Sequence, residues 1–179
     1  KGDTFQDRST AVITPTRTGV IHERVVNTML KLVGPLNHPR EWFFTYGHEV
    51  GVAYDAAIER ILKNPETREW KWILTYEDDM LPPPDAHVRL LEAAEKGYDA
   101  CGALYFTKGV DRVPMAYGDP AQVDDFRPMT ALRAQAGGAE EVNGLGMGFT
   151  LWKLELFKEL PSPWFQTVVE KSGDSYSQD

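Results

Sequence analysis

Three consecutive carboxylates, Glu77, Asp78 and Asp79, follow an apolar run at residues 71–76. Three prolines at 82–84 then prevent a strand from continuing. A strand that ends at clustered acids places them at one edge of a sheet, and open α/β sheets bind ligands at the edge formed by the carboxyl ends of their strands. Carboxylate oxygens suit a hard cation such as Mg²⁺ or Mn²⁺, which in turn suits a phosphate-bearing substrate. The alternative interpretation is a solvated acidic turn.

The composition predicts a single domain with a substantial core, because 179 residues include 42% hydrophobic and 26% charged side chains. No apolar stretch approaches the ~20 residues of a transmembrane helix, and the first residues do not resemble a signal peptide. The single cysteine, Cys101, lies in an apolar run and is expected to be a buried small hydrophobe. A single cysteine cannot form a disulfide within the chain, so a reducing, cytoplasmic location is expected. The net charge of −8 argues against a broad basic surface for duplex nucleic acid.

Apolar periodicity predicts strands alternating with helices along the first 106 residues. Strands are expected at 11–14, 42–46, 71–76 and 99–106, and helices at 21–33, 51–62 and 85–96. Pro15 is expected to stop the first strand. The alternation predicts βαβ units and a mostly parallel sheet flanked by helices. Glycine and proline interrupt residues 107–141, and a glycine-rich segment at 142–152 and a short helix at 153–160 follow.

Four segments, in this order, resemble nucleotide-sugar glycosyltransferases of the GT-A fold, most closely glycosyltransferase family 2. Residues 12–17 (VITPTR) resemble the first strand and loop that hold the nucleotide, and residues 74–82 (LTYEDDMLP) resemble the D-x-D motif. Residues 143–149 (NGLGMGF) resemble the glycine-rich strand near the acceptor, and residues 173–179 (GDSYSQD) resemble the stretch leading into the x-E-D motif. Two departures are Glu77 in place of the commoner first Asp and Gln178 where the family usually has Glu.

The resemblance implies one Rossmann-like GT-A domain over residues 1–179, with a nucleotide- and metal-binding half (1–106) and an acceptor-side half (107–179). It implies metal-dependent transfer of a sugar from a UDP- or GDP-sugar to an acceptor hydroxyl, with inversion, and Mn²⁺ or Mg²⁺ as cofactor. The acceptor is left open among a saccharide, a lipid carrier, a small metabolite and a modified nucleic-acid base. Members of the family continue into a helix and often a late metal-binding histidine, which leaves open whether further residues follow Asp179 or that part is disordered.

The resemblance also implies roles for individual residues. Asp79 is expected to contact the metal directly, and Glu77 to reach it through water or to contact the ribose. Asp78 is expected to point away from the metal, because side chains alternate at a strand end. It is nevertheless grouped with the residues expected to bind the nucleotide sugar. Asp179 is expected to be the general base that deprotonates the acceptor. The other expected donor contacts are Thr14, Pro15, Thr16, Arg17 and Asp55, and the expected acceptor-side residues are Gly146, Met147, Gly148, Trp164 and Phe165.

Several of these residues have plainer interpretations. Arg17 is either a bidentate phosphate ligand or an ordinary surface arginine, and Asp55 either faces the nucleotide or lies on a solvated helix face. The alternating glycines 144, 146 and 148 would share one side of a strand, leaving room for a ligand or another backbone, or would form a tight bend under a neighbouring helix. Trp164 and Phe165 form a platform for a sugar ring or belong to the core.

Two other functions remain open from the sequence. A nucleotidyltransferase also uses acids at a sheet edge and metal-bound phosphates, and Pro15-Thr16-Arg17-Thr18-Gly19 is a faint version of its glycine-rich loop. A degenerate, non-catalytic module that still binds a nucleotide sugar is the alternative outside the enzymes, and Gln178 favours it.

Overall fold

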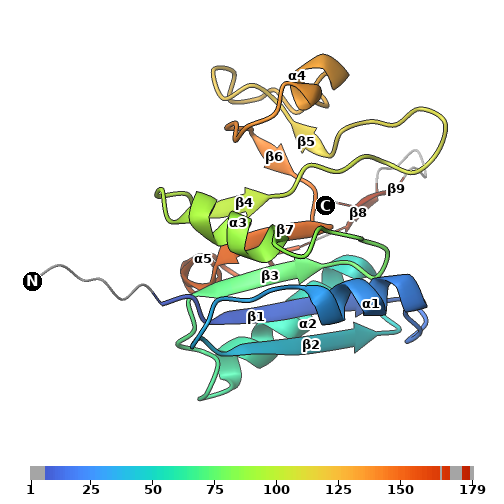
Figure 1. Cartoon of the computed structure of the whole chain (residues 1–179). Coiled ribbons are helices and arrows are strands. Elements are labelled where there is room, and N and C mark those ends of the chain that lie inside the picture. Colours follow the sequence, from blue (N-terminus) through green and yellow to red (C-terminus); the bar gives the residue numbers. More distant parts are fainter. Residues whose placement is uncertain (1–6, 166, 170–174, 178–179) are drawn as a thin grey trace, which may run out of the picture.

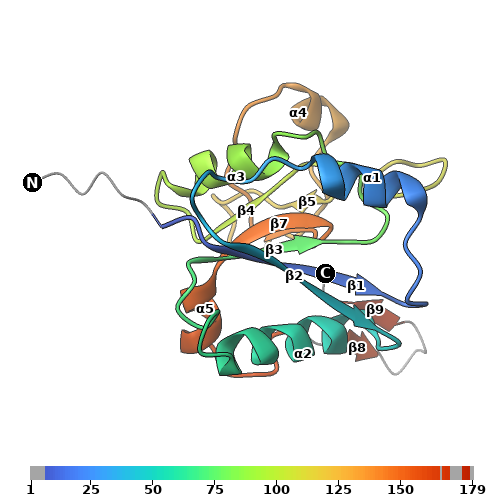
Figure 2. The ribbon, with the colours of Figure 1, turned by 60° about the horizontal axis from the view of Figure 1, so that its bottom comes forward.

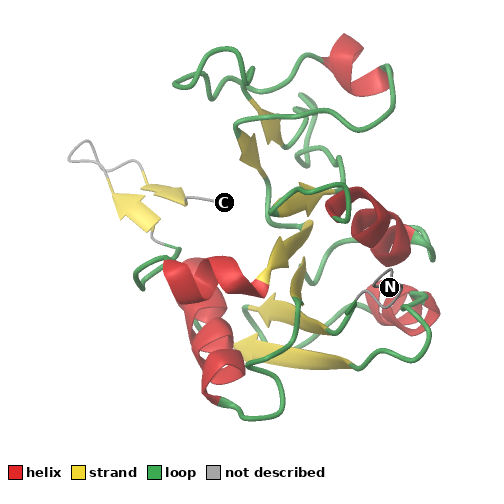
Figure 3. Ribbon diagram, turned by 90° about the vertical axis from the view of Figure 1, so that its left-hand side faces the viewer, coloured by secondary structure: helices red, strands yellow, loops and turns green. Residues whose placement is uncertain are grey.

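The computed structural model describes residues 7–165, 167–169 and 175–177. Its centre is a five-stranded sheet between two layers of helices (Figures 1 and 3). In pairing order the strands are β2 (Arg40–Tyr46), β1 (Thr10–Thr16), β3 (Trp72–Tyr76), β7 (Phe149–Lys153) and β4 (Ala100–Gly102). β1 pairs in parallel with β2 and β3, whereas β7 is antiparallel to β3 and β4. The prediction of a mixed α/β domain with a mostly parallel sheet is confirmed.

Helices cover both faces of the sheet, as Figure 2 shows from below. The helices α1 (Glu23–Lys31) and α3 (Ala86–Ala94) lie on one face, and α2 (Val50–Lys63) and α5 (Leu154–Glu159) lie on the other. Val12 packs in the cluster that contains residues of α1 and α3, whereas Ala11 and Ile13 pack in the cluster that contains residues of α2 and α5. Strands with two buried faces read as continuous apolar runs, which is why the sequence predicts the centre of the sheet well.

Two strands end at residues other than those predicted. The expectation that Pro15 stops the first strand is wrong, because β1 continues to Thr16. The pairing of β1 with β3 ends at Ile13, so beyond that point β1 is paired with β2 alone. The missing N–H of Pro15 is tolerated where one neighbour is absent. β4 is shorter than the expected 99–106, because the chain leaves the sheet after Gly102 and Tyr105 pairs instead with Met115, whose amide donates to its carbonyl at 2.9 Å.

The segment between β4 and β7 forms a small lobe beyond the β4 edge of the sheet (Figure 1). It contains the two-stranded pair β5 (Ala116–Tyr117) and β6 (Gly144–Leu145) and the short helix α4 (Ala131–Gln135). The side-chain amide of Asn143 donates to the carbonyl oxygens of Asp119, Gln122 and Asp125 at 3.0, 2.7 and 2.9 Å. Residues that the sequence predicts to be irregular are thus fixed by side-chain hydrogen bonds rather than by long secondary structure.

The chain that follows α5 reaches the start of α2 and forms a second two-stranded pair, β8 (Thr167–Val169) with β9 (Ser175–Ser177). Figures 1 and 2 both place this pair near the end of the sheet where β1 and β2 finish. Within the described part of the chain, no helix is both long and apolar enough to cross a bilayer.

A buried histidine lies between α3 and β1. His87 is completely buried, and its Nε2 is 3.2 Å from the hydroxyl of Thr10. Burial, followed by the positive charge of Arg40, lowers the pKa of His87 from 6.5 to about 4. The folded protein therefore keeps this imidazole neutral at pH values at which the unfolded chain protonates it.

This histidine should make stability depend on pH. Between pH 6.5 and pH 4 the unfolded state binds a proton that the folded state excludes. The free energy of unfolding should therefore decrease as the pH is lowered through this range, by up to about 3 kcal/mol. We expect His87→Gln to flatten this part of the profile, measured by urea unfolding at a series of pH values. An equal slope in the variant and the wild type would contradict this role of His87, and His48→Gln, at an exposed histidine, is the matched control.

Candidate functional site

An open cleft of about 760 Å³ lies at the carboxyl ends of β1, β2 and β3. Each strand contributes the residues that follow it, so three segments distant in sequence form one wall. The lining residues are Pro15, Thr16 and Arg17 after β1, Gly47, His48, Glu49 and Val50 between β2 and α2, and Glu77 and Asp78 after β3. The structure therefore brings the expected donor loop together with two of the three clustered acids.

The turn between β2 and α2 was not among the residues that the sequence predicts for the site. Gly47 has a φ of 76°, a conformation that favours glycine, and its amide donates to the carbonyl of Thr16 at 3.3 Å. Glu49 caps α2 by accepting from the amide of Val52 at 3.2 Å. The signal for this turn was present, since the second parallel strand must end at the same edge as the first.

The first acid of the triplet is held by the core beneath it. Tyr76, directly before it, is fully buried, with its ring edge-on to Phe149 at 5.2 Å, and burial raises the pKa of its hydroxyl to about 12. Glu77 therefore projects to the opposite side, where its carboxylate accepts from the hydroxyl of Tyr54 on α2 at 3.3 Å. Its amide donates to the carbonyl of Gly148 at 2.9 Å. The main chain and the side chain of Glu77 are thus both anchored.

One of the other two acids is oriented differently from the prediction. Asp78, which was expected to point away, lines the cleft. Asp79 forms an ion pair with Lys108, and the hydrogen bond to Asp79 raises the pKa of this lysine. Lys108 belongs to a tight loop in which the amide of Thr107 donates to the carbonyl of Val113 at 2.9 Å. Among the described residues, no three His, Cys, Asp or Glu side chains gather as a metal site, so metal binding by Glu77 and Asp79 stays a prediction.

The expected donor loop divides into buried and accessible residues. Thr14 is completely buried and does not line the cleft, so the structure places it in the wall behind the expected nucleotide contacts. Thr16 lines the cleft but is itself buried, and no described residue forms a hydrogen bond with its hydroxyl. Arg17 is exposed at the same wall, where its guanidinium is open to an anionic ligand.

The backbone of the glycine-rich segment packs closely against the side chain of Tyr105. Gly144 belongs to β6 and Gly148 precedes β7, so the expectation of one strand with all three glycines on one side is wrong. Tyr105 crosses Gly146 and Gly148, and its hydroxyl accepts from the amide of Gly148 at 3.0 Å. A Cβ on Gly148 would lie only 2.7 Å from the ring of Tyr105. A side chain, rather than another backbone, fills the space that these glycines leave, and the intervening Met147 is buried in the core.

The aromatic residues after α5 belong to the core on the α2 side of the sheet. Phe165 packs against Tyr54 at 5.5 Å, and Trp164 packs edge-on against Phe157 at 5.8 Å. The carboxylate of Asp55 accepts from the amides of Trp164 and Phe165 at 3.0 and 3.1 Å. Burial of this carboxylate, opposed by these hydrogen bonds, raises its pKa. Asp55 therefore anchors the chain after α5, which fits neither a nucleotide contact nor a solvated helix face, whereas Trp164 and Phe165 belong to the core.

Asp179 and Gln178, the expected base and its neighbour, lie outside the described residues. Cys101, expected to be buried, is only half-buried and packs against the cluster beneath α1 and α3. Burial raises the pKa of its thiol.

The fold and the site define the chain as an α/β domain with a cleft at the carboxyl edge of a mostly parallel sheet. No protein-family model and no curated protein matches the sequence. Among solved structures, the chain is similar to the protein A197 from STIV, with a TM-score of 0.62 and 19% sequence identity over 88% of this chain and 71% of that protein. This similarity supports the architecture alone.

The anchoring role of Asp55 leads to a stability prediction. Asp55→Ala should remove two hydrogen bonds to a carboxylate and lower the free energy of unfolding by about 1–2 kcal/mol. Hydrogen exchange of the amides of Trp164 and Phe165 should accelerate in the same variant. Glu59→Ala, which removes an exposed ion pair with Lys63 on the same helix, should change stability by less than about 1 kcal/mol. If the two variants behaved alike, the anchoring role of Asp55 would be refuted.

Proposed function

We propose that this protein is a metal-dependent glycosyltransferase that takes a sugar from a nucleoside diphosphate sugar, with UDP- and GDP-sugars as the expected donors, and passes it to an acceptor hydroxyl. The proposal includes the GT-A identity of the fold and a cytoplasmic location. The observation that carries it is the charge of the cleft. Carboxylates of Glu49, Glu77 and Asp78 line it, against the single guanidinium of Arg17.

This charge balance determines how a diphosphate can bind. A diphosphate brings further negative charge to a wall that already has a surplus of carboxylates, so the two repel each other unless a cation lies between them. The same wall is built of oxygen ligands at the carboxyl edge of parallel strands, which suits Mn²⁺ or Mg²⁺. An acidic cleft is thus compatible with a phosphate-bearing donor when a divalent cation accompanies it.

The residues of the chain have distinct roles in the proposed reaction. Asp79 and Glu77 would hold the cation, whose chemistry is Lewis-acid stabilisation of the departing diphosphate. Arg17 would pair with phosphate oxygens, and the buried Thr16 would form the wall beside it. The bond from the anomeric carbon to the phosphate oxygen breaks as the acceptor oxygen bonds to that carbon. The acceptor proton passes to a base, for which Asp179 is the expected residue.

The ion pair between Asp79 and Lys108 supports a specific form of this site. The ammonium group of Lys108 lies at Asp79, the carboxylate proposed to hold the metal, so the lysine and a metal cation would compete for it. Lys108 lies on an exposed loop, and its displacement from Asp79 would leave its charge near the diphosphate. Lys108 was not predicted from the sequence, because no local pattern connects residue 108 with residue 79.

Removal of the expected metal ligand should abolish metal-dependent nucleotide binding. We expect Asp79→Ala to weaken binding of the donor diphosphate in Mn²⁺ by at least tenfold in isothermal titration calorimetry, because the phosphate charge is no longer neutralised. Asp124→Ala, at an exposed acid in the lobe between β4 and β7, is the matched control. Unchanged binding by Asp79→Ala would refute the D-x-D assignment. Nucleotide binding without sugar transfer or hydrolysis by the wild type would instead favour the non-catalytic module.

Removal of the competing ammonium should have the opposite effect on the metal. We expect Lys108→Ala to bind Mn²⁺ more tightly than the wild type in the absence of nucleotide, by roughly threefold to tenfold, because Asp79 no longer has an internal counter-ion. The fraction of free Mn²⁺ can be followed by electron paramagnetic resonance. Lys96→Ala, at an exposed lysine after α3, should leave the affinity unchanged. Weaker Mn²⁺ binding by Lys108→Ala would contradict the competition.

A further inference from the structure

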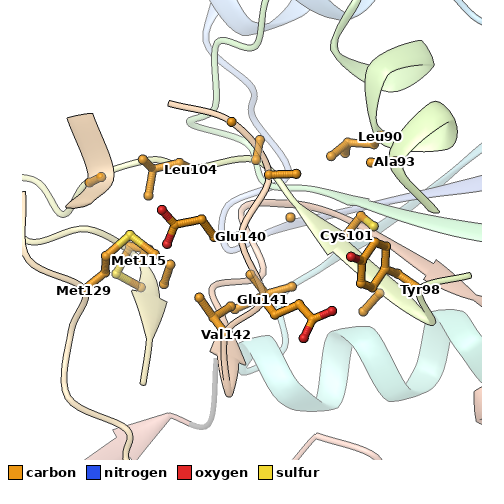
Figure 4. Close-up of a pocket in the computed structure, with 18 of the residues that line it drawn as sticks. Leu90, Ala93, Tyr98, Cys101, Leu104, Met115, Met129, Glu140, Glu141 and Val142 are labelled. Carbon is orange, nitrogen blue, oxygen red and sulfur yellow. The ribbon is translucent and has the colours of Figure 1, made fainter. Parts of the chain in front are cut away.

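A second cavity, of about 400 Å³, lies between the edge of the sheet and the lobe that follows β4 (Figure 4). Leu90 and Ala93 of α3 and Cys101 of β4 form one wall, and Met115 and Met129 of the lobe contribute to the other. The cavity shares no lining residue with the cleft at the carboxyl edge. Its volume is in the range of sites for small organic molecules.

The walls of this cavity are mainly apolar. Leu90, Ala116 and Met129 are themselves buried and present side chains to it, and Met115 lies beside them. The pocket is open to solvent, so an apolar ligand that covers these walls removes apolar surface from water, which is favourable. Methionine side chains adapt to ligands of varied shape. The cavity therefore favours an apolar ligand body.

The polar groups at its rim have a negative balance. The guanidinium of Arg133 donates to the carboxylate of Glu140 and to the carbonyl oxygens of Gly118 and Glu141 at 3.4 and 3.3 Å. Its charge is thus paired within the lobe. The second carboxylate, Glu141, also lines the cavity, where it forms a hydrogen bond with Tyr98 and adds a further negative charge at the rim (Figure 4). An anionic head group would meet this surplus unfavourably.

We propose that this cavity is a binding site for a small amphiphile that inserts an apolar body between α3 and the lobe and places a cationic polar end at Glu141. A neutral polar end is accepted less well, and an anionic one is rejected. The site is independent of the proposed sugar transfer, because it uses other residues and requires no metal.

Cys101 provides a direct reporter of occupancy. It is the single cysteine of the 179-residue chain, it is half-buried, and it forms part of the cavity wall. A ligand in the cavity covers the thiol and slows its reaction with an uncharged maleimide. The ¹³C shifts of the methyl groups of Met115 and Met129 give a second readout that does not depend on thiol reactivity.

The experiment compares octylamine, 1-octanol and octanoate, each below its aggregation concentration, with the full chain. We expect octylamine to protect Cys101 and to shift both methionine methyl signals at concentrations at least tenfold lower than octanoate, with 1-octanol between them. Glu141→Gln should reduce the advantage of the amine and leave 1-octanol unaffected, whereas Glu92→Gln on the exposed side of α3 should change neither. Equal or better protection by octanoate would refute the charge assignment.

Filling the cavity tests its location. Ala93→Phe, from α3, and Ala134→Phe, from the lobe, should each abolish the methyl shifts produced by octylamine, whereas Ala56→Phe, at an exposed position of α2, should not. Melting curves establish that each variant is folded, and Ala134→Phe is decisive if Ala93→Phe does not fold. The proposal is overturned if a folded filled variant binds octylamine like the wild type, or if none of the three compounds shifts the methionine methyl signals of the wild type.

Discussion

The parallel pairing of β1 with β2 and β3 is the constraint on which the candidate site depends. Parallel strands finish at a common edge, so the registers that pair Thr16 with Tyr46 and Ile13 with Thr75 also align the segments that follow these strands. Both faces of β1 and β3 are buried, which fixes the register, because a shift by one residue would exchange the two faces. The cleft is therefore positioned by the core rather than by its own loops.

The core positions this edge of the sheet, where carboxylates that repel one another lie close together. Tyr76 is held inside, Glu77 is bonded to Tyr54, and Asp78 faces the same cleft. The result is a group of carboxylates with a surplus of negative charge, which the protein relieves at Asp79 with Lys108. The lobe between β4 and β7 supplies this lysine, and it also supplies Tyr105, which lies on Gly146 and Gly148. The irregular segment therefore completes the edge of the sheet as well as enclosing a cavity of its own.

The sequence predicts the fold and part of the site, for identifiable reasons. Residues 71–76 form a continuous apolar run, and residues 51–62 have a helical apolar periodicity. β3 and α2 accordingly lie within one or two residues of the expected bounds. Pro15, Thr16, Arg17 and Glu77 are predicted because a strand end is a local signal. The contacts of Asp55 with residues 164–165 and of Asp79 with Lys108 join segments far apart in the chain, and no local pattern reveals them. The strand expected to contain all three glycines fails because tertiary packing around Tyr105 overrides the alternation.

The acidic cleft is proposed to bind a nucleoside diphosphate through a divalent cation. The most direct test of this binding is the melting temperature of the wild type with UDP, GDP, CDP, dTDP or ADP, each in Mn²⁺ and in EDTA. A ligand at about 100 times its dissociation constant stabilises a protein by roughly 2.7 kcal/mol, which corresponds to roughly 5–10 °C at this size. The account predicts such a shift for one diphosphate in Mn²⁺ and none in EDTA. No shift with any of the five, or an equal shift in EDTA, would contradict it.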